Sequence, residues 1–273
     1  MKVVLSRKGM DSASGGIPSP ILPNGTLLSL PIPDPKSEVP YGALVYKGHT
    51  YQEIIQQICP TFNFQKHCHC HLDPDIYGAL KDKPVGWKPA FGQYGIPAKH
   101  LDRQGVDVGD VFLFYGMFRQ TQKLPDGTLR FVNGAPTQHI IYEYMVVSEI
   151  LKNQDKIEKL YSWHPHAAST SHPDNRLYLA KDYGVFENCN SLLLSKPNQQ
   201  NSRRLWSLPT FFAKKGISIS WQGGNGPRLV GDHAEMNSSC RGQEFVITAN
   251  AKIPGLEEQL REWTERLIGH ALA

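Results

Sequence analysis

The sequence predicts an α+β protein built on a mixed β-sheet, and three observations carry this prediction. Residues 109–118 and 140–150 are long apolar segments rich in aromatic and β-branched residues, which is typical of buried strands. Residues 256–272 repeat apolar residues at helical spacing and predict an amphipathic C-terminal helix. The 24 glycines and 20 prolines among 273 residues predict many turns and irregular connections.

The remaining elements follow from local patterns. Residues 3–6 predict a first strand, and residues 50–59 and 154–160 predict short helices. Seven of the 20 prolines fall between residues 18 and 40, which favours an extended, proline-rich N-terminal arm over a helix or central strand. A turn at residues 125–127 separates the two long strands, and this pair predicts a small PUA-like β-barrel core.

Amino-acid composition and net charge argue against several classes of protein. The net charge is +4 and the sequence pI is about 8.7, which fits an anionic partner but is lower than expected for a dedicated nucleic-acid binder. The five cysteines form no Cys-x-x-Cys pair, which argues against a zinc ribbon or a disulfide framework. No apolar segment is long enough to span a membrane. We therefore expect one domain over residues 1–273, a cytoplasmic location and no membrane partner.

The segment from His67 to Asp75, HCHCHLDPD, carries the most unusual chemistry in the chain. In an extended backbone its three imidazoles share one side, because side chains alternate along a strand. Imidazole and carboxylate groups suit Zn²⁺ or Fe²⁺, so His69, His71 and Asp73 are candidate ligands of a divalent metal. The alternative is structural: Asp73 and Asp75 cap a turn at Pro74. Trp163-His164-Pro165-His166 and His172 are a second histidine group, either joining the first or lying in a solvated loop.

Two further segments favour an anionic or planar ligand. Ser6-Arg7-Lys8-Gly9, with Asp11, follows the first strand and forms either an anion pocket or a simple turn. Residues 202–216 interleave four Lys and Arg residues with Trp206, Phe211 and Phe212, a combination that suits base stacking but also fits a core strand with charged ends. The chain lacks the Gly-x-Ser-x-Gly, Gly-x-Gly-x-x-Gly and His-Glu-x-x-His motifs, so the common hydrolase, dehydrogenase and metalloprotease classes lose their usual support.

An ordered set of segments then resembles one known family. The set is MKVVLSRKGMDSASGGIPSPILPNGTLLSLPIPD, HLDPDI, FGQYG, QGVDVGDVFLFYGMFR, HIIYEYMVVSEI, NRLYLA, LWSLPTFF and RGQEFVI. It resembles the third family of nucleotide-modification-associated domains, bacterial and phage proteins associated with DNA-base modification systems. The resemblance covers nearly the whole chain and implies an α+β fold. Glu143-Tyr144 stand where the family often has Gly-Trp, and His67 and His69 lie outside the family motif.

The resemblance implies a set of functional polar residues. The positions that match the family motifs are Arg7, Asp11, His71, Asp73, Asp75, Arg119, Arg241, Gln243 and Glu244. Other partners implied are DNA or a nucleotide and further proteins of a modification system. The sequence does not identify the cofactor beyond the divalent metal considered above.

Two functions from different classes remain open, with a scaffold in a modification or defence complex as a third. The first is an enzyme acting on a nucleotide or nucleobase, with catalytic residues Asp75, Asp73, His71, Asp11 and Glu244. The second is a non-catalytic reader of a modified or flipped base. The nucleotide-binding residues predicted for either function are Arg7, Lys8, Tyr115, Arg119, Tyr144, Trp206, Arg241 and Gln243.

Overall fold

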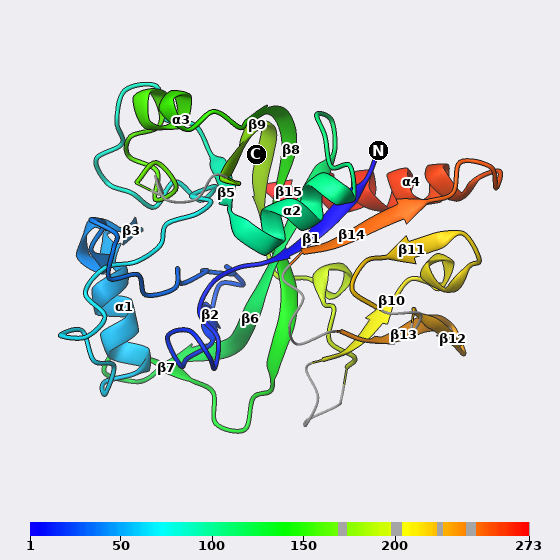
Figure 1. Ribbon diagram of the computed structural model, residues 1–273. Helices are drawn as coiled ribbons and strands as arrows, with labels where there is room; N and C mark the ends of the chain where they lie inside the picture. Colours follow the sequence, from blue (N-terminus) through cyan, green and yellow to red (C-terminus); the bar gives the residue numbers. More distant parts are fainter. Residues whose placement is uncertain (169–173, 198–203, 223–225, 239–243, 273) are drawn as a thin grey trace.

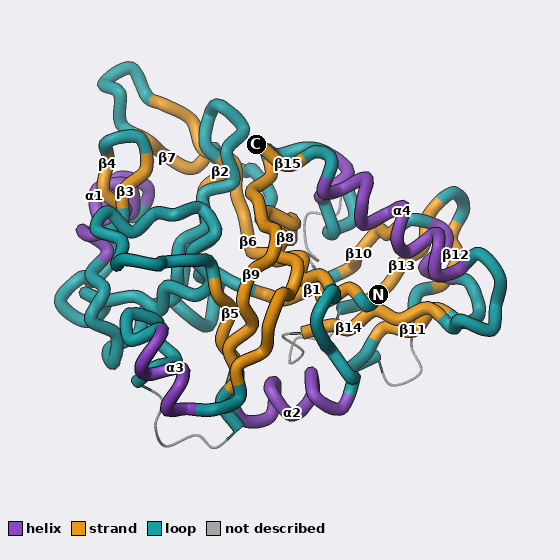
Figure 2. The backbone as a smooth tube through the Cα atoms, turned by 90° about the horizontal axis from the view of Figure 1, so that it is seen from above, coloured by secondary structure: helices purple, strands orange, loops and turns teal. Residues whose placement is uncertain are grey.

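The computed structural model describes the whole chain except residues 169–173, 198–203, 223–225, 239–243 and 273. It is a mixed α+β structure whose main sheet curls into a half-barrel (Figures 1 and 2). From edge to edge this sheet runs β11 (Ile217–Ile219), β14 (Glu244–Ala249), β1 (Val3–Arg7), β6 (Val111–Lys123), β8 (Thr137–Leu151), β9 (Arg176–Phe186) and β15 (Ala271–Leu272). Off this path, β2 (Ser19–Ile21) and β7 (Leu129–Phe131) pair with β6, and β5 (Ala90–Gln93) pairs with β9.

Smaller elements surround this sheet. A second sheet has the order β10 (Leu205–Leu208), β13 (His233–Asn237) and β12 (Arg228–Val230), and β3 (Val45–Tyr46) pairs with β4 (His49–Thr50). The helices are α1 (Tyr51–Ile58), α2 (Gly95–Arg103), α3 (Gln154–Leu160) and α4 (Leu256–Ile268). Three 3₁₀ turns, η1 (Tyr41–Ala43), η2 (Asn190–Leu192) and η3 (Thr210–Ala213), complete the described elements.

The long apolar segments form the centre of the sheet, as predicted. β1 runs parallel to β6, and β8 runs antiparallel to both β6 and β9. The first eight residues of β6, VFLFYGMF, are all buried, which explains their continuous apolar sequence. The register of β6 and β8 shifts between Phe114 and Tyr115, opposite Tyr142. Such an irregularity bends a strand and redirects the side chains beside it.

The predicted helices form for identifiable reasons. α1 begins at a capping box in which Thr50 and Glu53 bond each other's backbone N–H groups, and its buried face includes Ile54 and Ile58. α4 buries Leu260, Trp263 and Leu267 and ends at Ile268, earlier than the sequence pattern suggested. The chain then turns and pairs β15 with the end of β9. The helix predicted at 154–160 is confirmed as α3.

Two finer parts of the predicted fold are not confirmed. The main sheet is a curled half-barrel with the parallel β1–β6 pair at its centre, so a PUA-like barrel core does not follow from it. Residues 18–40 contain β2, and Leu22, Leu28 and Leu30 are buried in a second core cluster with residues of α1. An extended arm lying over the core is therefore not confirmed either.

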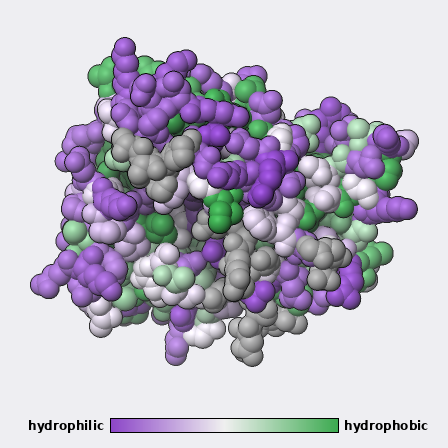
Figure 3. All heavy atoms as spheres, viewed as in Figure 1, coloured by the Kyte–Doolittle hydropathy of each residue, from purple (hydrophilic) through white to green (hydrophobic). Residues whose placement is uncertain are grey.

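The surface gives a general picture of the molecule. The face in Figure 3 is mostly hydrophilic, with apolar side chains in small separate patches. Among the described residues, no helix is long and apolar enough to cross a membrane.

Candidate metal centre and its cavity

A cavity of about 960 Å³ opens beside the half-barrel and contains most of the polar residues that the sequence singles out. This volume lies within the usual range of ligand sites, about 300–1,000 Å³. Of the predicted site residues, those that line it are Arg7, Lys8, Asp11, His71, Asp73 and Asp75. Three segments far apart in the sequence therefore meet here: the end of β1, the loop at 71–75 and the loop at 162–168.

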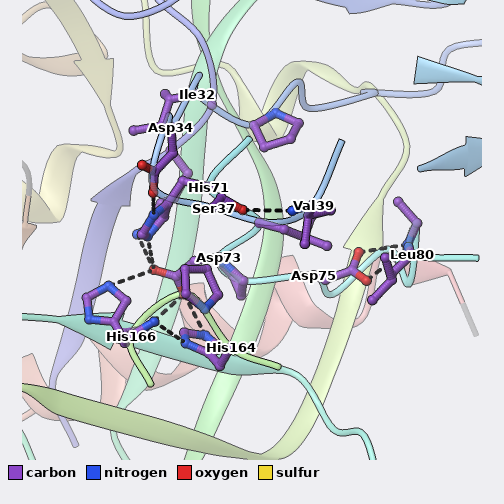
Figure 4. Close-up of a pocket in the computed structure, with 18 of the residues that line it drawn as sticks. Ile32, Asp34, Ser37, Val39, His71, Asp73, Asp75, Leu80, His164 and His166 are labelled. Atoms are coloured by element: carbon purple, nitrogen blue, oxygen red, sulfur yellow. Dashed lines mark hydrogen bonds and ion pairs between the residues drawn. The ribbon is translucent and has the colours of Figure 1, made fainter. Parts of the chain in front are cut away.

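Asp73 is the centre of this site, and its side chain is completely buried (Figure 4). Its Oδ1 atom accepts a hydrogen bond from the backbone N–H of Gly92 on β5, at 2.9 Å. Its Oδ2 atom accepts from Lys8 Nζ at 3.2 Å. The Nε2 atoms of His71 and His166 lie 3.6 and 3.7 Å from that same Oδ2 atom.

Burial alone raises the pKa of the Asp73 carboxyl, but its partners outweigh this effect. The charge of Lys8 and the hydrogen bonds from His164 and His71 hold the pKa well below its usual range. Asp73 is therefore a carboxylate at neutral pH, and its lone pairs face the imidazoles.

The hydrogen-bond network assigns the tautomer of His166. The amide nitrogen of Asn175 donates to Gln154 Oε1 and to the backbone oxygen of His166, so Asn175 Oδ1 is an acceptor. His166 Nδ1 lies 2.8 Å from this oxygen and must donate to it. Burial lowers the pKa of His166 to about 3, so the ring is neutral and Nε2 carries a lone pair. The proximity of His166 to Asp73 is therefore a contact of two acceptors rather than an ion pair.

His71 is oriented in a similar way by a carboxylate. Its Nδ1 atom donates to Asp34 Oδ2 at 2.9 Å, which turns Nε2 towards Asp73. Burial lowers the pKa of His71, but the hydrogen bonds that the ring donates to Asp34 and Asp73 outweigh it and leave the pKa raised. Metal ligation by His71 would replace a proton on Nε2, since a ligating imidazole is neutral.

His164 has a different role from its neighbour. Its Nδ1 atom accepts from the backbone N–H of His166 at 3.2 Å, so Nε2 carries the proton. That Nε2–H lies 3.1 Å from Ala90 O and 3.4 Å from Asp73 Oδ1. His164 therefore holds Asp73 in place and has no free lone pair for a metal.

The donor set of His71, Asp73 and His166 fits a divalent metal. One ligand atom from each residue lies within 4.8 Å of the other two. Metal–ligand bonds of about 2.0–2.2 Å require ligand atoms roughly 3.0–3.4 Å apart, so small movements close this set on an ion. Two imidazoles and one carboxylate, each imidazole fixed by a bond at its other nitrogen, are typical of Zn²⁺ and Fe²⁺ sites that keep open positions.

Gly92 makes this arrangement possible. A Cβ atom at this position would lie 2.3 Å from Cγ and Cδ2 of His166. The backbone of β5 can therefore approach both His166 and Asp73 only because the residue has no side chain.

The other predicted site residues lie in different surroundings. Asp75 is buried and its two oxygens accept the backbone N–H groups of Ala79 and Leu80, so its carboxylate closes a turn pointing away from the metal centre (Figure 4). His69 is bonded to Cys68 Sγ at 3.3 Å and lies outside the ligand set, whose third member is His166 instead. Glu244 is buried and accepts from Gln93, which lines the cavity.

The predicted base-binding residues are mostly enclosed in the protein. Tyr115, Tyr144 and Trp206 are 1%, 5% and 0% exposed and belong to the main core, so no base reaches their rings in this conformation. Arg119 donates to Val132 O and does not line the cavity. Arg241 and Gln243 lie outside the described residues.

Glu143 is a residue whose importance the sequence did not reveal. It lies on β8 beside the register shift, lines the cavity and is 3% exposed. Burial, with the charge of Asp75, raises the pKa of its carboxyl well above the usual range. Its Oε2 atom has no hydrogen-bond partner among the described residues. The departure from Gly-Trp at this position was the only sequence signal.

The fold and the cavity together define an α+β protein with a buried two-histidine, one-carboxylate centre open to a ligand-sized space. A model of the family described as nucleotide modification associated domain 3 matches residues 2–248. The chain belongs to this family, whose description associates it with the modification of nucleotides. No curated protein and no solved structure matches the chain.

Proposed function

We propose that the protein is a metal-dependent enzyme that modifies a nucleotide or nucleobase, with His71, Asp73 and His166 as the metal ligands. The family description supplies the substrate class, and the metal centre supplies the reason to expect catalysis. The observation that carries the proposal is the meeting of one ligand atom each from His71, Asp73 and His166 within 4.8 Å of one another in a largely buried place. The lone pair of His166 Nε2 faces the Asp73 carboxylate at 3.7 Å, and two such acceptors repel unless a cation lies between them.

A metal with three protein ligands keeps positions open for substrate or water, which is the arrangement of catalytic rather than structural sites. Zn²⁺ there would supply an activated water, and Fe²⁺ would supply oxidative chemistry. The chain's own groups orient the ligands: Asp34 fixes His71, Asn175 fixes His166, and Gly92 and His164 fix Asp73. We assign Asp75 a structural role in its turn and keep Asp11 and Glu244 as polar groups near the cavity.

The test compares His166→Ala with His69→Ala, because both remove a histidine but only the first removes a proposed ligand. Purified proteins are analysed for bound iron and zinc by mass spectrometry. In parallel, nucleosides digested from the DNA of cells that carry the gene in its native genome are compared with those of a deletion strain.

We expect His166→Ala to lose the metal and to reproduce the nucleoside profile of the deletion, while His69→Ala keeps both the metal and the intact profile. A His166→Ala protein with normal metal content and a normal nucleoside profile would refute the proposal. Profiles that are identical in all strains, deletion included, would refute a modifying activity and favour the reader.

A further inference from the structure

The side chain of Lys8 lies mostly inside the protein, which is unusual for a lysine. It follows the last residue of β1, lines the cavity, and its side chain is only 15% exposed. Its ammonium lies 4.2 Å above the ring of Phe91, which adds a favourable cation–π contact. Among the described residues, Asp73 is the only carboxylate within ion-pair distance of Lys8.

Lys8 and the proposed metal share one carboxylate oxygen. Lys8 donates to Oδ2 of Asp73, and the same oxygen faces Nε2 of His71 and of His166. A carboxylate oxygen has lone pairs for two partners, so Lys8 and a metal ion can bind it together. The centre then holds a divalent cation and an ammonium against the single negative charge of Asp73.

Two neighbouring carboxylates, those of Asp34 and Glu244, are engaged by other groups, whereas Glu143 Oε2 has no partner among the described residues and burial raises the pKa of that carboxyl well above its usual range. Asp34 accepts from the far nitrogen of His71, and Glu244 accepts from Gln93. Arg7, one residue before Lys8, also lines the cavity and is 25% exposed, with its guanidinium 3.8 Å from Asp11. The cavity as a whole is lined by seven Asp or Glu and three Lys or Arg residues, but at Asp73 itself the Lys8 ammonium and a bound divalent metal would carry more positive charge than the single carboxylate they share.

We propose that Lys8 and the metal together form a subsite for an anionic group, a carboxylate or a phosphate, of the substrate or of a co-substrate. The anion ligates an open position of the metal and accepts a charge-assisted hydrogen bond from Lys8. This inference rests on the metal centre of the proposed function, and it adds the chemical class of the ligand that the centre takes.

The experiment uses the full-length protein loaded with Co²⁺, whose visible absorption reports changes in its ligands. Co²⁺ is first titrated into the wild type and each variant, which gives the metal affinity on its own. Oxalate and inorganic phosphate are then titrated separately into the Co²⁺-loaded proteins. The variants are Lys8→Met, Lys8→Arg and, as a matched control, Lys36→Met, which removes an exposed lysine lining the same cavity.

We expect Lys8→Met to bind Co²⁺ at least as tightly as the wild type, because a competing cation is removed, and to bind the anion roughly 10- to 100-fold more weakly. Lys8→Arg keeps the charge and should retain more of the anion affinity than Lys8→Met. Lys36→Met should change the anion affinity by less than about fivefold. Tighter binding of oxalate than phosphate would indicate a carboxylate co-substrate, and the reverse would indicate a phosphate of the nucleotide.

Two results would overturn the subsite: an anion affinity that Lys8→Met leaves unchanged, or a Co²⁺ spectrum that neither anion alters in the wild type. Failure of the wild type to bind Co²⁺ at all is a different result, since it refutes the metal centre of the proposed function.

Discussion

Replacing Glu244 with Gln should change how the stability of the protein depends on pH. Burial raises the pKa of Glu244 to about 7, against an opposing influence of Lys8 and Gln93, while the unfolded chain has the ordinary value of 4.5. The folded state therefore binds this proton more tightly, so the contribution of Glu244 to stability is full at low pH and declines as pH rises from about 4.5 to about 7. Integrated from pH 5 to pH 8, this loss amounts to roughly 2–3 kcal/mol.

The assay is urea unfolding of the wild type and Glu244→Gln at pH 5, 6, 7 and 8, with Glu262→Gln on the exposed face of α4 as the control. The free-energy difference between wild type and Glu244→Gln isolates this carboxyl from the histidines, which also titrate in this range. We expect the difference to move by roughly 2–3 kcal/mol in favour of the Gln variant between pH 5 and pH 8. A difference that stays constant with pH would refute the raised pKa of Glu244 in the folded protein.

Two further substitutions test the surroundings of the site, and a third tests the packing of α4. Gly92→Ala places a Cβ atom 2.3 Å from the His166 ring and should weaken metal binding roughly 10- to 100-fold, while Gly226→Ala, in open space, should not; calorimetric metal titration decides between them. Asp75→Asn replaces an acceptor of two backbone N–H groups and should cost about 1–3 kcal/mol in urea unfolding; a larger effect on metal affinity than on stability would contradict its structural role. Trp263→Ala empties the contact of α4 with Phe211 and Phe212 and should cost about 3–5 kcal/mol without changing metal affinity.

The helices and strands that could be predicted from the sequence are those whose structure follows from the spacing of their apolar residues. The two long strands, α1 and α4 are confirmed because each buries a continuous or periodic apolar face. The small PUA-like barrel core is not confirmed because strand order depends on distant pairings. The strands that pair in parallel with β6 are β1 and β2, which lie about a hundred residues earlier, and no local pattern records these partnerships.

The residues of the candidate site likewise fall into those that the sequence indicated and those that only the structure brings together. His71 and Asp73 stood out because they are two residues apart in an unusual segment, whereas His166 joins them across more than ninety residues. The sequence had noted the Trp163–His166 segment as a second histidine group without being able to choose among its members. His166 is selected because Asn175 fixes the direction of its Nε2 lone pair and because Gly92 leaves room for its ring. Tyr115 and Trp206 appeared suited to base stacking because aromatic side chains look the same in a sequence whether they line a cavity or fill a core.

The C-terminal segment has a consequence for the stability of the protein. α4 leaves the sheet at β14, packs Trp263 against η3, and leads to β15, which pairs with β9 beyond β6 and β8 (Figure 1). The last residues thus tie together strands that lie far apart across the curl of the sheet, and they lie beyond residues 2–248 that the family model matches. A chain ended at residue 248 would keep every proposed metal ligand but lose this tie. We expect such a chain to unfold at a lower urea concentration than the full-length protein, because the core also loses Leu260, Trp263 and Leu267 of α4.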